Sequence, residues 1–420
     1  MSADKMILGE NAIYSTDCAK TGLNNNILVC GSSGCGKTMS IAEPRILETF
    51  NSSLIITLTK RGIAKKYKSL FKQRGYIVED LNFINPVDSD VSYDPLQYIA
   101  SYADITFLSE AIVNANPKKD KSTADPYWDE AAISLLSAEI SYTLMTKDNA
   151  TFVDVLKLHD RLDFKEDNGR ITTSLDKKFE YLEDVDPSCF ALSCWKSFHQ
   201  LPIKTAGCVF GTLNTALDTI FSPELRKMII LERKVDFERL ASRKTVLFIS
   251  TSAVNSALHR FINIFYAQAF KVLFEYAESL PSGRLPIPVH VLCDDFATGS
   301  PIQDFPEYIS VFREKQISVT LLVQSESQLA HMYGNEDATT IINNCDTYLF
   351  MGGMDLKTGH SISERLNTPL DEVLYMPLGQ VVIFRRGQKP VITQRYNILE
   401  NKLYQSIMNQ YQEITISHDR

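Results

Sequence analysis

The chain has 420 residues, of which 44% are hydrophobic and 22% are charged, and its formal net charge is −8 at pH 7. This composition predicts a globular protein with a large core in two or more domains. The acidic balance argues against a uniformly basic nucleic-acid binder, but it allows a local basic channel. The eight cysteines lack a paired metal spacing, which favours reduced thiols in a cytosolic protein.

No segment has the pattern of a signal peptide or a membrane span, because charged residues interrupt the first thirty positions. The longest apolar-rich segment, residues 260–277, contains Arg260, Lys271 and Glu275, which is typical of a buried amphipathic helix. The seven histidines are dispersed and no H-E-x-x-H run occurs, so the sequence does not indicate a metalloprotease. His290 lies within an apolar run and is predicted to be packed rather than to bind a ligand.

Short strand-like runs alternate with helical patterns, which predicts an α/β fold. The predicted strands span residues 26–30, 53–58, 76–83, 245–250, 288–293, 317–323, 346–352 and 380–384. Residues 102–236 are predicted to form a mainly helical insertion, in which Asp125 and Pro126 begin a helix as N-cap and first residue. Residues 1–101 and 237–420 then form one discontinuous domain.

The phosphate-binding pattern G-x-x-x-x-G-K-[ST] is matched by one run, Gly31-Ser32-Ser33-Gly34-Cys35-Gly36-Lys37-Thr38. Glycines let successive backbone N–H groups face an anion, and the helix that follows points its N-terminus at the same anion. In such a loop Lys37 reaches the β- and γ-phosphates, and the Thr38 hydroxyl binds Mg²⁺. A buried strand before the loop and a helical pattern from Lys37 onward supply the context that the pattern needs. The sequence therefore predicts a nucleoside triphosphate site.

A phosphate loop of this kind also needs a carboxylate on a neighbouring strand to hold Mg²⁺. In the run VHVLCDDF, Asp294 ends an apolar strand, and Asp295 stands where many such ATPases place the carboxylate that orients the attacking water. An Asp-Asp pair after a strand is, by itself, equally typical of a turn. Together with the phosphate loop, the pair favours Asp294 as a metal ligand.

Longer segments resemble the coupling-protein ATPases of bacterial conjugation and type IV secretion, which are TraG/TraD-like relatives of the FtsK and HerA DNA pumps. The segments are GLNNNILVCGSSGCGKT, DPYWDEAAISLLSAEI, LCDDFATGSPIQDFPEYISVFREKQISVTLLVQSESQLAHMYG, TIINNCDTYLFMGG and LDEVLYMPLGQVVIFRRGQKPV. The similarity runs from about Gly22 to about Tyr396 and keeps the family's order of motifs.

The resemblance implies a RecA-like P-loop NTPase sheet flanked by helices, with a mainly α-helical domain inserted between the nucleotide motifs. It implies a homo-oligomeric ring, usually hexameric, with ATP and Mg²⁺ between neighbouring subunits. By position, Lys37 and Thr38 bind phosphate and Mg²⁺, and Asp294 is the Walker B aspartate. Arg313 takes the place of the arginine that reaches the neighbour's γ-phosphate, and Gln324 that of the sensor that couples this phosphate to movement. Without the resemblance, Arg313 is typical of a solvated helix charge and Gln324 of a strand-end amide.

The activity implied by the resemblance is ATP-driven movement of DNA, or of a relaxase–DNA conjugate, to a conjugative type IV secretion channel. Many relatives begin with transmembrane helices, whereas the residues before the first predicted strand are polar here. Either a membrane anchor has been removed, or this is a soluble subtype. We expect the second, a cytoplasmic protein, peripheral at the inner face of the membrane, that contacts the membrane through a partner. Three basic clusters within residues 61–68, 118–121 and 385–389 are candidates for DNA contact, although each is more typical of a solvated face.

Two departures from the family pattern leave other functions open. The family usually has Glu at the position of Asp295, and Asp is shorter by about 1.5 Å of reach. Positioning errors near 1 Å can cost about 10²-fold in rate. The run TLTKRG at residues 57–62 replaces an acidic turn that contains Pro and Gly. Both departures favour, as one alternative, a nucleotide-gated cargo adaptor with weak hydrolysis. A HerA-like DNA-processing pump outside conjugation is the other alternative.

Overall fold

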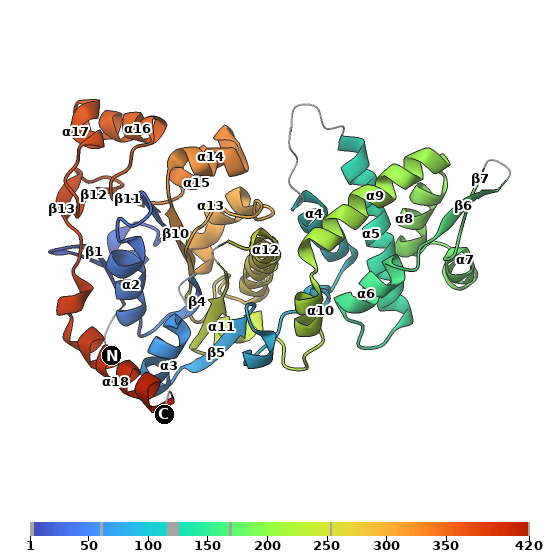
Figure 1. The fold of residues 1–420 in the computed structure, drawn as a ribbon, viewed down its shortest axis with the longest axis horizontal. Coiled ribbons are helices and arrows are strands. Elements are labelled where there is room, and N and C mark those ends of the chain that lie inside the picture. Colours follow the sequence, from blue (N-terminus) through green and yellow to red (C-terminus); the bar gives the residue numbers. More distant parts are fainter. Residues whose placement is uncertain (1–3, 59–61, 116–125, 168–169, 253, 419–420) are drawn as a thin grey trace.

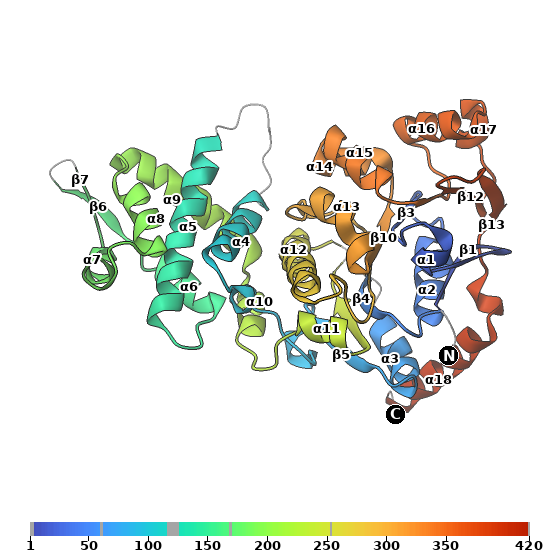
Figure 2. The same ribbon diagram turned by 180° about the vertical axis from the view of Figure 1, so that it is seen from behind.

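The computed structural model describes residues 4–58, 62–115, 126–167, 170–252 and 254–418. A large sheet with helices on both faces forms one part of the molecule, and a group of helices lies beside it (Figure 1). The view from behind has the same two parts side by side (Figure 2). Within the described part of the chain, none of the helices has the length and apolar character that a membrane crossing requires.

Nine strands of the described chain form the large sheet, in the order β13-β12-β11-β3-β10-β9-β4-β8-β5. Their bounds are β3 Ile27–Cys30, β4 Ser53–Leu58, β5 Ile77–Asn82, β8 Thr245–Ser250, β9 Val289–Cys293, β10 Ile317–Val323, β11 Thr347–Phe350, β12 Gln380–Arg385 and β13 Val391–Gln394. The strands from β11 to β5 run parallel, whereas β12 and β13 pair antiparallel. The predicted α/β class is confirmed, and eight of these strands match the predicted runs within two residues at each end.

The central strands β3, β9 and β10 are buried along their whole length because helices cover both faces of the sheet. In β3, Leu28 and Cys30 point into one core, and Ile27 and Val29 point into the other. The first core is shared with α12 (Ser256–Ser279) and α13 (Phe305–Lys315). The second core is shared with α2 (Glu43–Leu47), α3 (Ile63–Gln73) and α18 (Lys402–His418).

The elements within residues 102–236, here called the helical group, lie to one side of the sheet (Figure 1). The helices are α4 Tyr102–Asn114, α5 Pro126–Thr146, α6 Phe152–His159, α7 Asp176–Val185, α8 Phe190–His199, α9 Ile203–Ile220 and α10 Pro223–Ile229. A hairpin of β6 (Phe164–Asp167) and β7 (Arg170–Thr173), which the sequence did not predict, interrupts them. Helix α5 begins at Pro126 as predicted, while the expected cap Asp125 lies outside the described residues.

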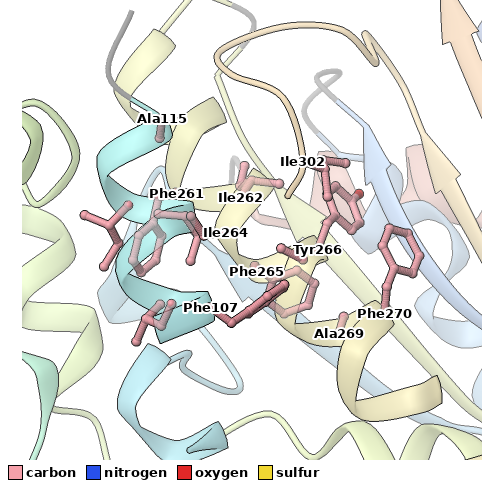
Figure 3. Packing of buried hydrophobic residues seen from close by; sticks show 14 of the residues in the cluster. Phe107, Ala115, Phe261, Ile262, Ile264, Phe265, Tyr266, Ala269, Phe270 and Ile302 are labelled. Carbon is pink, nitrogen blue, oxygen red and sulfur yellow. The ribbon is translucent and has the colours of Figure 1, made fainter. Parts of the chain in front are cut away.

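Helix α12 joins the helical group to the sheet. Figure 3 shows Phe261 and Ile264 facing Phe107 of α4, while Tyr266 and Phe270 lie toward the sheet. The helix contains the apolar-rich segment 260–277, so the prediction of a buried helix is confirmed. Its charged residues are accommodated by pairing, since Lys271 contacts both Asp104 and Glu275.

The remaining elements are short. They are β1 Lys5–Gly9, β2 Ala12–Ser15, α1 Cys18–Thr21, the 3-10 turns η2 Pro86–Asp88, η3 Pro95–Tyr98 and η4 Ile398–Glu400, and the helices α11 Phe237–Ser242, α14 Glu326–Tyr333, α15 Asn335–Asn343, α16 Leu356–Leu366 and α17 Leu370–Leu374.

The helix predicted from Lys37 begins as a π-helical turn, η1 (Thr38–Ala42), before α2. The physical reason is Pro44, which has no N–H to donate to the carbonyl of Ser40 four residues earlier.

Candidate nucleotide site

Parallel strand pairing brings three of the predicted segments to one edge of the sheet. Cys30 at the end of β3 pairs with Val323 at the end of β10, and Leu321 of β10 pairs with Cys293 at the end of β9. The residues that follow these strands, Gly31, Gln324 and Asp294, therefore emerge together. This carboxyl edge is where open parallel sheets bind ligands.

The phosphate loop between β3 and η1 depends on its glycines. Gly34 and Gly36 have φ angles of 80° and 97°, in the left-handed region that side chains disfavour. A Cβ atom on Gly36 would lie 2.9 Å from Nη1 of Arg395, and one on Gly31 would lie 2.8 Å from Sγ of Cys35. Glycine is thus required both for the curl of the loop and for the close approach of its neighbours.

The Lys37 ammonium is folded against its own loop. Its Nζ donates to the carbonyl oxygen of Gly31 at 2.5 Å and to that of Ser32 at 3.1 Å, and the residue is only 9% exposed. These are neutral carbonyl partners, so the positive charge is not neutralised by an ion pair. A buried ammonium held in this way is a strong attractor for an anion that enters the loop.

Thr38 and Asp294 supply the chemistry of a magnesium site. Thr38 Oγ1 donates to Asp294 Oδ2 at 3.2 Å. Burial raises the pKa of the Asp294 carboxyl, the adjacent Asp295 carboxylate raises it further, and the hydrogen bond from Thr38 opposes both effects. A divalent cation would favour the ionised form. A hydroxyl and one carboxylate suit Mg²⁺, which takes few protein ligands beside water and phosphate oxygens.

Asp295 begins a tight turn beside the loop. Its backbone has φ 50°, a left-handed conformation that Asp tolerates better than most residues. The backbone N–H of Asp295 donates to Asp294 Oδ1 at 3.2 Å, and its carbonyl accepts from Thr298 Oγ1 at 2.8 Å. Asn263 of α12 holds the far end of the turn, since Nδ2 donates to the carbonyls of Thr298 at 2.9 Å and Ser300 at 2.6 Å.

Gln324 follows β10 directly, and its side chain lines the cleft above the loop. Its backbone N–H donates to Oε1 of Gln328 at 3.0 Å. The amide nitrogen of Gln328 donates in turn to the carbonyl of Ala297 at 3.3 Å. Gln328 therefore ties the strand end of Gln324 to the turn that carries Asp295, a link that no sequence motif indicated.

These groups line one cleft of about 800 Å³. From the phosphate loop, the cleft is lined by Ser33, Gly34, Gly36, Lys37 and Thr38, but not by Gly31, Ser32 or Cys35. Asp294, Asp295 and Gln324 line it too, as does a segment near the C-terminus, residues 394–399. Arg395 in this segment donates from Nη1 to the carbonyl of Cys35 at 3.1 Å. Sequence reasoning missed this segment, because it follows the last strand and carries no known motif.

Arg313 is the predicted residue that the fold does not bring to this cleft. It is exposed on α13, just before β10 begins at Ile317, so it stands at the amino edge of the sheet. There it lines a separate cavity of about 680 Å³ together with Asp17 and Arg284. Within one subunit, Arg313 and the phosphate loop lie at opposite ends of β10.

The other predicted residues are accounted for by packing and pairing. His290 is buried, with Nδ1 2.8 Å from Ser318 Oγ and Nε2 2.9 Å from Thr320 Oγ1, so its packed role is confirmed. In the basic clusters, several cations are already paired within the chain, as in Lys66–Glu43, Lys68–Asp90 and Arg386–Asp346. The cluster at 118–121 and residues 59–61 of the TLTKRG run lie outside the described residues.

Solved structures with a similar fold include two of the plasmid coupling protein TrwB. The unbound monoclinic form of TrwBdeltaN70 has a TM-score of 0.68 and 16% identity, covering 94% of this chain and 88% of that one. TrwB in complex with ADP and Mg²⁺ has a TM-score of 0.64 and 16% identity, covering 89% and 85%. VirB4 of Thermoanaerobacter pseudethanolicus has a TM-score of 0.54 and 13% identity, covering 94% and 97%.

No curated protein gives a significant match to the chain. The family model described as type IV secretory system conjugative DNA transfer matches residues 2–369, which is most of the sequence. The match includes the phosphate loop, the helical group, the Asp294–Asp295 pair and Gln324. The fold and the family match agree with the resemblance seen in the motifs, and the chain belongs to the type IV secretory system conjugative DNA transfer family.

Proposed function

We propose that this chain is an ATP-driven coupling protein that delivers DNA, or a relaxase–DNA conjugate, to a conjugative type IV secretion channel. The observation that carries the proposal is the convergence of Lys37, Thr38 and Asp294 in one cleft at the carboxyl edge of the sheet. Residues 256 positions apart in the sequence meet there with the groups that a nucleoside triphosphate needs.

In this proposal each residue has one task. Lys37 exchanges the two loop carbonyls for the β- and γ-phosphates, while backbone N–H groups of the loop hold the same phosphates. Thr38 and Asp294 hold Mg²⁺, which neutralises charge on the phosphates when it is bound. Asp295 orients the attacking water, and Gln324 senses the γ-phosphate from the end of β10.

The catalytic arginine is proposed to come from the neighbouring subunit of a homo-oligomeric, hexameric ring. Arg313 is exposed, and it stands at the opposite edge of the sheet from the phosphate loop. Such a residue can meet a nucleotide only on another subunit, and head-to-tail packing around a ring brings the two edges together. An arginine in this role supplies roughly 10³–10⁵ in rate.

The partners follow from the family. DNA, a relaxase and channel components are the proposed cargo and docking partners, at the cytoplasmic face of the membrane. Membrane contact is proposed to run through a partner, in keeping with the lack of a membrane-spanning helix among the described residues. Since several basic side chains are already engaged in ion pairs, DNA grip is proposed to depend on ring assembly, which multiplies a few cations per subunit.

A second candidate is a nucleotide-gated adaptor that binds ATP and cargo but hydrolyses slowly. Asp295 favours it, because the carboxylate is one methylene shorter than the family's Glu and its backbone is fixed in the left-handed region. The adaptor and the motor share the same nucleotide site and differ in turnover.

The deciding experiment measures ATP turnover of the purified chain at high protein concentration, with and without DNA, using Lys37→Ala as the blank. We expect Mg²⁺-dependent turnover that DNA stimulates, with Lys177→Ala, at an exposed position on α7 outside the three basic clusters, behaving as the wild type. Absence of turnover above the blank rejects the motor. Retained ATP binding in that case would support the adaptor instead.

A further inference from the structure

One wall of the nucleotide cleft belongs to residues that the family match does not include. The match ends at residue 369, whereas Gln394–Leu399, here called the C-terminal wall, lines the cleft beside the phosphate loop. The wall connects β13 to α18 and contains the turn η4. Its place in the cleft lets it contact a part of the nucleotide that the phosphate loop, Asp294 and Gln324 do not bind.

Arg395 fixes the wall to the phosphate loop. Its Nη1 donates to the carbonyl of Cys35 at 3.1 Å, and its backbone N–H donates to the carbonyl of Gly379 at 2.7 Å. The guanidinium lies so close to Gly36 that a Cβ there would come within 2.9 Å of it. The wall is thus attached at two points, one of them on the loop itself.

The nucleoside must lie in the part of the cleft that the triphosphate does not fill. The proposed function places the γ-phosphate beside Asp295 and Gln324, which line the cleft. The cleft is also lined by Met39 and Ser40, by the C-terminal wall and by Leu378. In loops of this kind the chain that follows the Lys-Thr pair lies next to the α-phosphate, so the sugar and base project in this direction.

Two leucines of the cleft lining are exposed in the described part of the chain. Leu378 is 101% exposed and Leu399 is 56% exposed, and both line the cleft. Asn397 of the wall is engaged within the chain, since it donates to Glu400 Oε1 and accepts from the N–H of Leu399. The Tyr396 hydroxyl likewise accepts from Asn401. The exposed leucine side chains suit the flat faces of a base.

We propose that the C-terminal wall and Leu378 form the nucleoside subsite of this protein, taking the base of a nucleoside triphosphate against Leu378 and Leu399 while Arg395 holds the phosphate loop in place. The inference rests on the proposed nucleotide function and extends it to residues outside the family match. Arg395 is a positioning residue for the loop, and the two leucines are the contacts to the ligand.

The test compares two probes by calorimetry on the full chain in the presence of Mg²⁺: a non-hydrolysable ATP analogue and inorganic tripolyphosphate, which has no nucleoside. For the double variant Leu378→Ser/Leu399→Ser, we expect the dissociation constant of the analogue to rise about tenfold and that of tripolyphosphate to change less than about twofold. For Arg395→Ala, we expect both probes to weaken by about fivefold, because the loop loses its brace.

Two matched controls sit outside the cleft. Leu356→Ser removes a leucine that is 59% exposed on α16, and Arg386→Ala removes an exposed arginine that donates to the carbonyl of Gly22. Neither should change the affinity for either probe. Unchanged affinity of the double leucine variant for the analogue overturns the subsite, as does an equal loss of affinity for tripolyphosphate. If the wild type binds neither probe, the nucleotide function itself fails, and the subsite with it.

Discussion

The Thr38 hydroxyl donates to the Asp294 carboxylate at 3.2 Å across 256 residues of sequence. This contact joins the end of the phosphate loop to the end of β9, the strand next but one to β3 in the sheet. It makes one hydroxyl and one carboxylate available at the same point, beside a lysine held by neutral carbonyls.

Asp294→Asn should abolish most magnesium-dependent turnover. The amide keeps the size and one acceptor oxygen of the carboxylate but loses the charge that attracts Mg²⁺, so we expect a loss of about 10²-fold or more in turnover. A titration of rate against magnesium concentration measures the effect. Asp371→Asn, at an exposed position on α17, is the control. Full activity at ordinary magnesium concentration would remove Asp294 from the metal site.

Asp295→Glu should raise turnover and lower stability slightly. The extra methylene restores about 1.5 Å of reach toward the attacking water, and the expected gain is about tenfold. At φ 50°, however, Glu fits the left-handed backbone less well than Asp. Turnover and melting temperature, measured on the same preparation, test the expected gain in rate and the expected loss of stability. A rate that stays level would mean that the native turn already positions its carboxylate correctly.

Arg313→Ala should silence turnover and leave nucleotide binding intact, with a loss of about 10³-fold in rate. The sharper test mixes this variant with Lys37→Ala, each inactive alone. In a mixed ring, the intact loop of one subunit meets the intact arginine of the other, so activity should return. A mixture as inactive as its components, under conditions where rings form, would place the catalytic arginine elsewhere.

Gly36→Ala should destroy nucleotide binding, because the new Cβ meets Arg395 at 2.9 Å and the backbone has φ 97°. Gly207→Ala is its matched control: the residue is within helix α9, and a Cβ there contacts nothing within 4 Å. That substitution should instead stabilise the protein by about 0.5–1 kcal/mol. Binding of a fluorescent nucleotide and thermal unfolding give the two readouts. Tight binding by Gly36→Ala would contradict the geometry of the loop.

Asp94 should make the protein less stable as pH rises. Burial raises the pKa of its carboxyl to about 6 although its oxygen accepts from the N–H groups of Leu96 and Phe152. The folded chain therefore holds this proton more tightly than the unfolded chain, whose Asp titrates near 3.8. The stabilising effect of that proton is present at low pH and is lost as pH rises from about 4 to about 6.

Asp94→Asn keeps an acceptor oxygen and removes the titration. Relative to the wild type, its stability should increase by about 2 kcal/mol between pH 4.5 and pH 7. Urea unfolding midpoints of both proteins at the two pH values measure this difference. Parallel behaviour of the two proteins across this range would show that Asp94 titrates as an exposed carboxyl does.

The sequence predicted the sheet well because its parallel strands are buried on both faces and appear as short runs dominated by apolar and β-branched residues, as in 317–323 for β10. The sequence did not predict the short strand β1, although it is mostly buried, nor several strands that are partly exposed. The exposed strand β13 and the hairpin β6–β7 carry no such run. The phosphate loop and Asp294 were found because fixed spacing encodes their chemistry. Arg395 could not be predicted, because it lies 360 positions after Cys35 in the sequence and only the fold brings the two residues together.

Helix α12 has a mechanical consequence. Asn263 grips the turn that begins at Asp295, and on the other side of the same helix Phe261 and Ile264 lie against α4 (Figure 3). The interior of a packed helix is stiff, so it transmits tilt rather than absorbing it. We therefore expect a displacement of the turn at Asp295 to be passed through α12 to the helical group. In the proposed function, α4 is then the first helix of the helical group to respond to events at the nucleotide.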